Sequence, residues 1–171
     1  MMLLKDYLPN LNKKFKNLSF SGLAFNSKEV KKNYIFIAIK GDRFDGNNYI
    51  NDAIKNGAKI IISSKFKDQI KNNIIYLKQK NPRQILSNLS SQIFKKKPQN
   101  LIAVTGTNGK TSIANFYSQI LKKNKKKVAS FGTLGISGKK KIENASNTTF
   151  DPIKIGKNLN YLEKKKINNV I

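Results

Sequence analysis

The apolar positions of the first hundred residues follow two different periods. Short apolar and aromatic runs predict extended segments or strands, at 18–27, 33–41, 58–64 and 73–77. Apolar residues spaced three and four apart predict helices, at 2–8, from Tyr49 to Gly57 and from Pro82 to Ile93. Strands that alternate with helices predict a small α/β domain, which we place at residues 1–97.

A second series of elements begins beyond Pro98, where we place the domain boundary. The run "LIAVT" predicts a buried strand. A helix is predicted next, with five residues on its apolar side, Ile113, Phe116, Tyr117, Ile120 and Leu121. Residues 126–132 predict another strand, and 135–147 a polar, hairpin-like segment.

The last predicted helix has a clear start signal. Asp151 is typical of an N-cap, and Pro152 of the first helical position. One face of this helix carries Ile155, Leu159 and Leu162. A final strand is predicted at 167–171. We interpret residues 98–171 as the first part of a parallel-sheet domain, and we expect the chain to be a truncated piece of a longer protein.

Composition narrows the possible chemistry. The chain has no Cys and no His, which excludes disulfides, thiolate metal sites and histidine general bases. A bound metal would be a hard cation on oxygen ligands. The N-terminus lacks the apolar core of a signal peptide, and no apolar run is long enough to span a bilayer, so we expect a cytoplasmic protein without membrane insertion.

The net charge of +25 raises the possibility of a nucleic-acid partner. Only Arg43 and Arg83 are arginines, whereas base recognition and bidentate phosphate contacts favour Arg. The lysines are spread over every segment, and Asn and Ile are also frequent, which indicates a compositional bias. We therefore expect a solvated surface, a monomer and no nucleic-acid partner.

The stretch "VTGTNGKTS", Val104–Ser112, lies between a predicted strand and a predicted helix, as a phosphate-binding loop requires. Gly106 and Gly109 would let backbone N–H groups turn inward, and the helix start would add its own free N–H groups. Lys110 would reach the β- and γ-phosphates, and Thr111 would place its hydroxyl on Mg²⁺. The alternative is an ordinary glycine turn beside an exposed lysine.

Four motifs together resemble the Mur ligases, the ATP-dependent amide-forming enzymes of peptidoglycan precursor synthesis. They are "TGTNGKTS", "GTLGI" at 132–136, "NTTFDP" at 147–152, and the segment from "FNSKEV" through "KGDRFDG" to "NGAKIII". "GTLGI" and "NTTFDP" are most similar to the diaminopimelate-adding branch of the family, and the last segment is similar to the family's N-terminal uridine-nucleotide domain. The resemblance covers essentially the whole chain.

The resemblance implies a function and an organisation. It implies a UDP-substrate-binding domain at 1–97, followed by an incomplete ATP-binding domain at 98–171. It further implies that meso-diaminopimelate is added to UDP-N-acetylmuramoyl-L-alanyl-D-glutamate through an acyl phosphate, with ATP and Mg²⁺ as cofactors. Other Mur ligases, lysine-adding or D-alanyl-D-alanine-adding, remain open, as does a non-catalytic nucleotide-binding or nucleic-acid-binding module. We expect these 171 residues alone to be inactive.

The resemblance also assigns residues. ATP would be bound by Gly106, Thr107, Asn108, Gly109, Lys110, Thr111 and Ser112, with Lys110 catalytic and Thr111 on the metal. The UDP-linked substrate would be bound by Phe25, Ser27, Asp42, Arg43, Phe44, Asn147, Thr148 and Thr149. Several have simpler roles open to them: Ser27 as a turn cap, Phe25 and Phe44 as core residues, Arg43 as a surface charge, and 147–149 as preparation for the cap at Asp151.

Overall fold

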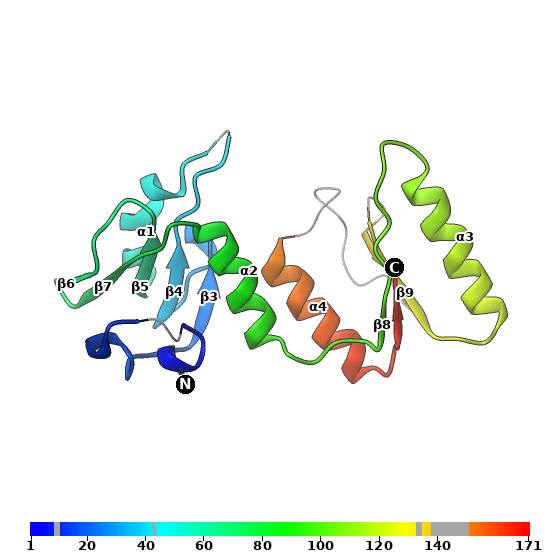
Figure 1. Ribbon diagram of the computed structural model, residues 1–171, viewed down its shortest axis with the longest axis horizontal. Helices are drawn as coiled ribbons and strands as arrows, with labels where there is room; N and C mark the ends of the chain where they lie inside the picture. Colours follow the sequence, from blue (N-terminus) through cyan, green and yellow to red (C-terminus); the bar gives the residue numbers. More distant parts are fainter. Residues whose placement is uncertain (9–10, 43, 133–134, 138–150) are drawn as a thin grey trace. The chain divides into compact units, whose positions relative to one another are not determined.

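The structure is a computed structural model that describes residues 1–8, 11–42, 44–132, 135–137 and 151–171. The chain forms two compact units, Met1–Gln92 and Ile93–Ile171. Each unit contains a largely parallel sheet with helices beside it (Figure 1). The predicted α/β class is confirmed.

The first unit is built on a five-stranded sheet with the order β3-β4-β5-β7-β6. Four strands are parallel: β3 (Gly22–Ala24), β4 (Tyr34–Ile37), β5 (Ala58–Ser63) and β7 (Ile74–Lys78). The edge strand β6 (Gln69–Lys71), which the apolar pattern did not predict, pairs antiparallel with β7. Its three residues are all exposed, so the sequence has no alternation of apolar and polar residues that would predict this strand. The carboxyl ends of the four parallel strands therefore lie along one edge of the sheet.

Short helices connect these strands. The 3-10 helix η3 (Ser27–Glu29) follows β3, and η4 (Gly46–Tyr49) leads into α1 (Ile50–Lys55) between β4 and β5. The predicted stop at Gly57 is confirmed, because its φ of 105° is left-handed and a Cβ there would come within 2.9 Å of Lys32 Cα. Helix α2 (Pro82–Ile93) follows β7 and buries Leu86 and Leu89, as its pattern predicted.

The core of the first unit lies on both faces of the sheet. One cluster is formed by Ala24, Val30, Phe36, Ala38, Ile50, Ala53, Ala58 and Ile61. The alternate strand positions Ile35, Ile37, Ile60, Ile62, Ile75 and Leu77 are buried as well, which is the pattern of a parallel sheet covered on both sides.

The N-terminal segment differs from its prediction. In place of a helix over 2–8, it has a two-residue strand, β1 (Met2–Leu3), and a 3-10 turn, η1 (Leu4–Asp6). β1 pairs with β2 (Ser19–Phe20), and a second 3-10 turn, η2 (Lys13–Phe15), lies between them. The apolar residues Leu4, Phe15 and Phe20 are fully buried. The packing of these side chains, and not the weak helical spacing of the apolar residues, therefore decides the conformation of this segment.

The second unit has a four-stranded sheet with the order β10-β9-β11-β8. Strand β11 (Asn169–Val170) runs parallel to both β8 (Asn100–Leu101) and β9 (Val128–Gly132), and β10 (Gly135–Ser137) returns antiparallel to β9. Helix α3 (Lys110–Lys123) connects β8 to β9, and α4 (Pro152–Lys164) precedes β11. No helix among the described residues is both long and apolar enough to cross a membrane.

Helix α4 follows its sequence signals. Asp151 caps it, since its carboxylate accepts a 2.9 Å hydrogen bond from the backbone N–H of Lys154, and Pro152 is the first helical residue. Leu159 and Leu162 are buried against β9 and β11 in a cluster with Ala129, Ile167 and Val170. The cap and the apolar face predicted from the sequence are both confirmed.

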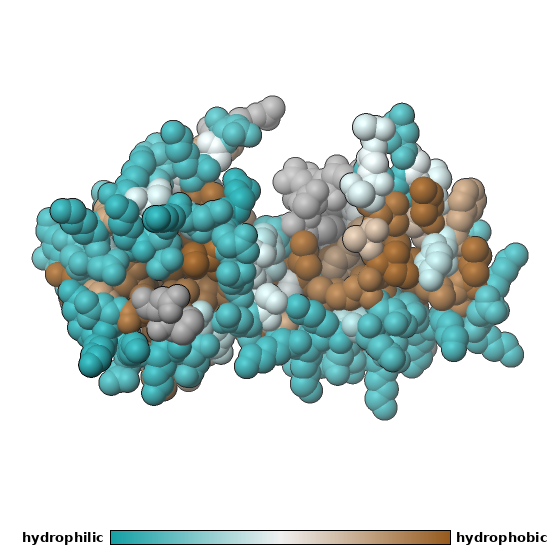
Figure 2. All heavy atoms as spheres, in the orientation of Figure 1, coloured by the Kyte–Doolittle hydropathy of each residue, from teal (hydrophilic) through white to brown (hydrophobic). Residues whose placement is uncertain are grey.

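Two expectations for this unit are wrong. The run "LIAVT" contributes only Leu101 to the two-residue edge strand β8, and Leu101 is exposed instead of buried. Helix α3 forms where predicted, but four residues of its apolar side lie at the surface, Ile113, Phe116, Tyr117 and Ile120. The helix faces the sheet instead through Ala114, Ser118 and Leu121, which are less exposed. Figure 2 shows hydrophobic side chains on the surface of this unit.

Candidate functional site

The loop between β8 and α3 has the backbone that its glycines predict. Gly109 is the N-cap of α3 and has left-handed dihedral angles, φ 78° and ψ −6°. Gly106 has a φ of 145°, a region that side chains rarely adopt. A Cβ at Gly109 would meet no atom within 4 Å. Backbone conformation, and not crowding, therefore requires glycine at this position.

Lys110 folds back over this loop. Its ammonium donates hydrogen bonds to the carbonyl oxygens of Gly106 and, at 3.0 Å, of Thr107. The side chain thus reaches back from the first residue of α3 to the carbonyl groups of the loop. The ammonium lies where the loop backbone and the helix start converge, which is the place that a bound anion would share with it.

The N–H groups of this loop have no competing acceptor in the described part of the chain. Ile113 N–H bonds to Gly109 O at 2.9 Å, but no hydrogen bond among the described residues uses the N–H groups of residues 107–112. The N-cap Gly109 has no side chain that could accept from the first turn of α3. These donors, the helix dipole and one ammonium form an arrangement suited to a polyphosphate.

The donor set also fits a magnesium ion held mainly by a nucleotide. Thr111 is exposed and offers a hydroxyl at the start of α3. The described residues contain no group of three or more acidic side chains that could hold a cation by themselves. Mg²⁺ commonly retains water and phosphate ligands and takes few ligands from protein, so one hydroxyl beside a triphosphate is compatible with it.

The predicted residues of the first unit follow strand ends. Phe25 and Ser27 follow β3, and Asp42 and Phe44 follow β4. Because β3 and β4 are adjacent and parallel, with Ala24 opposite Phe36, the two segments leave the same edge of the sheet. Topology therefore brings these predicted residues to one edge.

Ser27 does not act as the turn cap. The cap of η3 is Asn26, whose side-chain oxygen accepts a 3.1 Å hydrogen bond from Lys28 N–H. Ser27 is buried, and its carbonyl oxygen accepts a 2.9 Å bond from the side-chain amide of Asn56 in the turn after α1. Asn26 therefore provides the cap, and the Ser27 hydroxyl is not needed for capping.

The segment after β4 is a narrow hairpin (Figure 1). Lys40 and Asp45 form a β-bridge, and Gly41 N–H donates to Phe44 O at 2.8 Å. Gly46 closes the hairpin against the backbone of Ile39, where an added Cβ would lie 2.8 Å from the Ile39 nitrogen. Asp42 is exposed, and Phe44 is 71% exposed, so the reading of Phe44 as a core residue is wrong.

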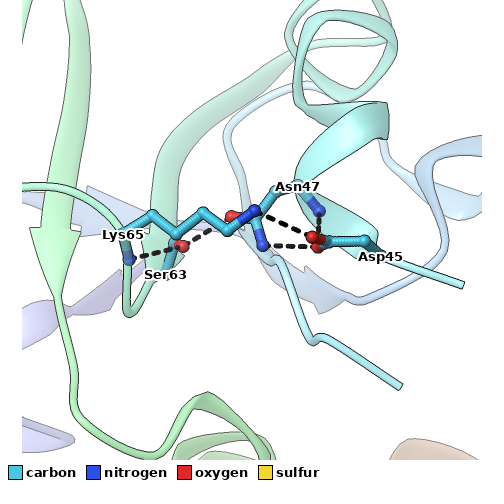
Figure 3. A network of polar contacts seen from close by, with 4 residues as sticks. All are labelled: Asp45, Asn47, Ser63 and Lys65. Atoms are coloured by element: carbon cyan, nitrogen blue, oxygen red, sulfur yellow. Dashed lines mark hydrogen bonds and ion pairs between the residues drawn. The ribbon is translucent and has the colours of Figure 1, made fainter. Parts of the chain in front are cut away.

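A four-residue polar network, which the sequence analysis did not find, joins the end of this hairpin to β5. It contains Asp45, Asn47, Ser63 and Lys65 (Figure 3). Asp45 Oδ1 accepts bonds from the backbone N–H and the side-chain amide of Asn47, at 2.9 and 2.6 Å. The hydroxyl of Ser63, fully buried, donates a 2.6 Å bond to Asn47 Oδ1 and accepts one from Lys65 N–H at 3.1 Å.

An ion pair completes the network. Lys65 Nζ lies 2.8 Å from Asp45 Oδ2. This ammonium, together with the two Asn47 donors, holds the pKa of Asp45 well below its ordinary value. Only the Asp-x-Asn spacing at the start of η4 was a local signal for the network, because Ser63 and Lys65 reach it through the sheet.

Four predicted site residues lie outside the described residues. They are Arg43, Asn147, Thr148 and Thr149. Their assignments stay predictions.

Comparison with known proteins identifies the family. The model of the Mur ligase family catalytic domain matches residues 19–125, and that of the Mur ligase middle domain matches residues 104–171. The chain belongs to the Mur ligase family. Both matches include the loop before α3. The residues suited to binding a polyphosphate therefore lie in a region of this Mur ligase chain that both family models cover.

Curated relatives of this Mur ligase chain are named UDP-N-acetylmuramoyl-L-alanyl-D-glutamate--2,6-diaminopimelate ligase. The protein of Rickettsia prowazekii is 40% identical over 83% of the chain and 30% of its own length. A Clostridium acetobutylicum protein with the same name, numbered 2, is 34% identical over 99% of the chain and 37% of its own length. The chain thus spans about a third of the length of these relatives.

Solved structures show the same fold. A ligase of that name has a TM-score of 0.76 over 99% of the chain and 35% of its own chain, at 23% identity. The MurF ligase of Thermotoga maritima, solved in complex with ADP, has a TM-score of 0.53 and 30% identity over 78% of the chain and 28% of its own. The α/β organisation derived above is therefore the Mur ligase organisation.

Proposed function

We propose that this chain supplies the UDP-substrate domain, at 1–97, and the beginning of the ATP domain, at 98–171, of a Mur ligase that adds meso-diaminopimelate to UDP-N-acetylmuramoyl-L-alanyl-D-glutamate. The names of relatives at 34–40% identity support this choice of substrates. Those relatives are about three times as long as the chain. We therefore propose the ligation reaction for a full-length Mur ligase, and the binding of ATP and of the UDP-linked substrate for the residues described above.

The observation that carries the proposal is the position of Lys110. Its ammonium lies over a loop whose N–H groups at 107–112 have no partner among the described residues. A triphosphate would take those N–H groups and draw the ammonium from the carbonyls of Gly106 and Thr107 to its own oxygens. The related MurF ligase was solved in complex with ADP, which supports an adenine nucleotide as the ligand.

The chemistry follows from charge. A carboxylate and ATP repel each other, so transfer of the γ-phosphoryl group to the substrate carboxylate needs positive charge and alignment. Lys110 would supply one charge, and Mg²⁺, with Thr111 as its protein ligand, would neutralise the phosphates. The diaminopimelate amine would then attack the acyl phosphate, releasing phosphate as the amide forms. No protein nucleophile is required, which agrees with a chain that lacks Cys and His.

The UDP-linked substrate is proposed to bind at the carboxyl edge of the first sheet. Phe25 and Ser27 would contact it from the end of β3, and Asp42, Arg43 and Phe44 from the hairpin after β4. Asn147, Thr148 and Thr149 would contact its peptide part. The exposure of Phe44 supports this, because an aromatic side chain at a hairpin tip, away from the core, is available to contact a base. We propose a cytoplasmic monomer that does not bind nucleic acid.

Calorimetric titration of the chain with UDP-N-acetylmuramoyl-L-alanyl-D-glutamate, and separately with Mg·ATP, tests both sites. Lys110→Met should weaken ATP binding about ten- to hundredfold, because a charge-assisted hydrogen bond contributes about 1.5–3 kcal/mol. Lys123→Met, at the other end of α3, is the matched control. Ser27→Ala should weaken the binding of the UDP-linked substrate about fivefold. Ser64→Ala, the matched control, should leave this binding unchanged. The proposal would be overturned if neither ligand showed saturable binding.

A further inference from the structure

Three lysine triplets, which lie far apart in the sequence, meet at one edge of the second unit. Lys95–Lys97 precede β8, Lys125–Lys127 precede β9, and Lys164–Lys166 precede β11. These three strands are parallel neighbours, with β11 between the other two. The triplets therefore all lie at the amino edge of the sheet, opposite the edge from which the Lys110 loop leaves. All nine lysines are exposed. We call these nine residues the lysine edge.

Hydrogen bonds hold the three segments together. The Asn169 side chain donates to Lys127 O at 2.9 Å and accepts from the Asn100 amide at 2.9 Å. Asn100 N–H also bonds to Asn168 O at 2.8 Å. Asn169 thus links the start of β11 to those of β8 and β9. Since neighbouring strands are about 4.8 Å apart, β8 and β9, which the outer two triplets precede, begin only about 10 Å from each other.

Acidic residues are scarce in the segments that form this edge. Residues 93–132 contain no Asp or Glu, and Glu163 is the acidic residue next to the third triplet. Lys122 and Lys123, in the last turn of α3, add to the same edge. Charges within about one Debye length, about 8 Å at physiological salt, reinforce one another's potential and repel. A polyanion that lies across the edge would gain attraction and relieve this repulsion.

We propose that the lysine edge is a docking surface for an anionic phospholipid bilayer. Clusters of about four to eight basic residues suffice for attraction to anionic headgroups, and lysine acts as a point charge that needs no defined partner geometry. The attachment is superficial, because no described helix is built to cross a membrane. Figure 2 shows hydrophilic side chains along this rim of the unit.

A nucleic acid fits the same edge less well. Residues 93–171 contain no arginine, the residue that best reads guanine and clamps phosphate. Single-strand binders intersperse aromatic platforms among their basic residues. Phe94, directly before the first triplet, is only partly exposed, and Tyr161, close to the third triplet, already has Lys165 Nζ 5.7 Å from its ring centroid. A sheet edge made of turns also presents no helix or ribbon for a duplex groove.

Cosedimentation of the 171-residue chain with vesicles tests this proposal, which does not depend on the proposed ligase function. Vesicles of equal parts phosphatidylglycerol and phosphatidylcholine should bind the chain, and pure phosphatidylcholine should not. The triple variant Lys96→Glu, Lys126→Glu, Lys165→Glu, one residue from each triplet, should bind at least about thirtyfold more weakly. The control Lys31→Glu, Lys67→Glu, Lys71→Glu makes the same charge change at exposed lysines of the first unit and should weaken binding less than about threefold.

The remaining outcomes also decide the question. A Gln series at the same positions removes charge without adding repulsion, so it provides a second test if the Glu variant does not fold by circular dichroism. Equal losses in the edge and control variants would show that only net charge matters, and would overturn the proposal. Tighter binding to single-stranded RNA than to the anionic vesicles at the same salt concentration would overturn it as well.

Discussion

The Ser63 hydroxyl donates a 2.6 Å hydrogen bond to the side-chain oxygen of Asn47, and this bond joins the carboxyl end of β5 to the helix that follows the exposed hairpin. Asn47 in turn donates twice to Asp45, the last residue of the hairpin bridge. The hairpin that carries Asp42 and Phe44 is therefore anchored to the sheet at its base.

Removal of this anchor should cost stability. Asn47→Ala leaves the buried Ser63 hydroxyl without its acceptor, and we expect the free energy of unfolding to fall by about 1–2 kcal/mol. Urea denaturation followed by circular dichroism measures the change. Asn48→Ala, at the adjacent exposed position, is the matched control and should change stability by less than about 0.5 kcal/mol. Equal effects of the two variants would contradict the anchoring role.

The Asp45–Lys65 ion pair predicts a defined pH dependence. The pKa of Asp45 is lowered in the folded state, so the unfolded chain binds the proton more tightly. The stability from Asp45 is therefore fully present above its unfolded pKa, about 3.9, and is lost as pH falls below that value. The difference in thermal midpoint between the wild-type chain and Asp45→Asn should stay constant from pH 5 to 8. It should shrink below about pH 4, and a difference that already changes near neutral pH would contradict the assignment.

The phosphate loop should be sensitive to backbone changes at its glycines. Gly109→Ala places a Cβ on a left-handed residue and should destabilise the chain by about 1 kcal/mol, although no neighbour obstructs it. Gly109→Asn should cost less, since Asn tolerates this conformation better. Gly106→Ala should cost at least as much as Gly109→Ala, because its φ of 145° suits only glycine. Denaturation of the three variants measures the order of their stability losses, and ATP titration measures the accompanying loss of affinity. If Gly109→Ala left stability unchanged, the loop would not require a left-handed residue at this position.

Helix α4 depends on its cap. Asp151→Ala removes the acceptor for Lys154 N–H and should reduce stability by about 0.5–2 kcal/mol. Asp151→Asn keeps an oxygen acceptor and should retain most of the stability that the cap provides. Amide hydrogen exchange in α4 reports the loss directly, because only this helix loses the bond. Equal exchange rates in both variants would exclude the cap as the source of stability.

The apolar side of α3 should be dispensable in this chain. Phe116 is 64% exposed, so Phe116→Gln should change the free energy of unfolding by less than about 0.5 kcal/mol. Leu162→Ala, in the fully buried position of α4, should cost about 2–5 kcal/mol. Chemical denaturation compares the two. A large loss in Phe116→Gln would show that the ring is covered in solution, by a second copy of the chain, which sedimentation would detect.

Local signals explain most of the elements that the sequence predicted correctly. The β-branched runs of β4, β5 and β7 are buried on both faces, and Pro82 and Asp151 start helices at the expected positions. The weak cases failed for a physical reason. Residues 2–8 and "LIAVT" are short apolar runs whose state depends on what packs against them, and β6 has no buried side chain to give it a period.

The sequence by itself determined the α/β alternation, the caps and the glycine-rich loop before Lys110, because each depends on neighbours within a few residues. Only the tertiary structure decided that Ser63 reaches Asn47, that one side of α3 is exposed, and that three lysine triplets meet at one edge. Those contacts depend on strand order and register, which bring together residues up to about 70 positions apart and leave no local pattern in the chain.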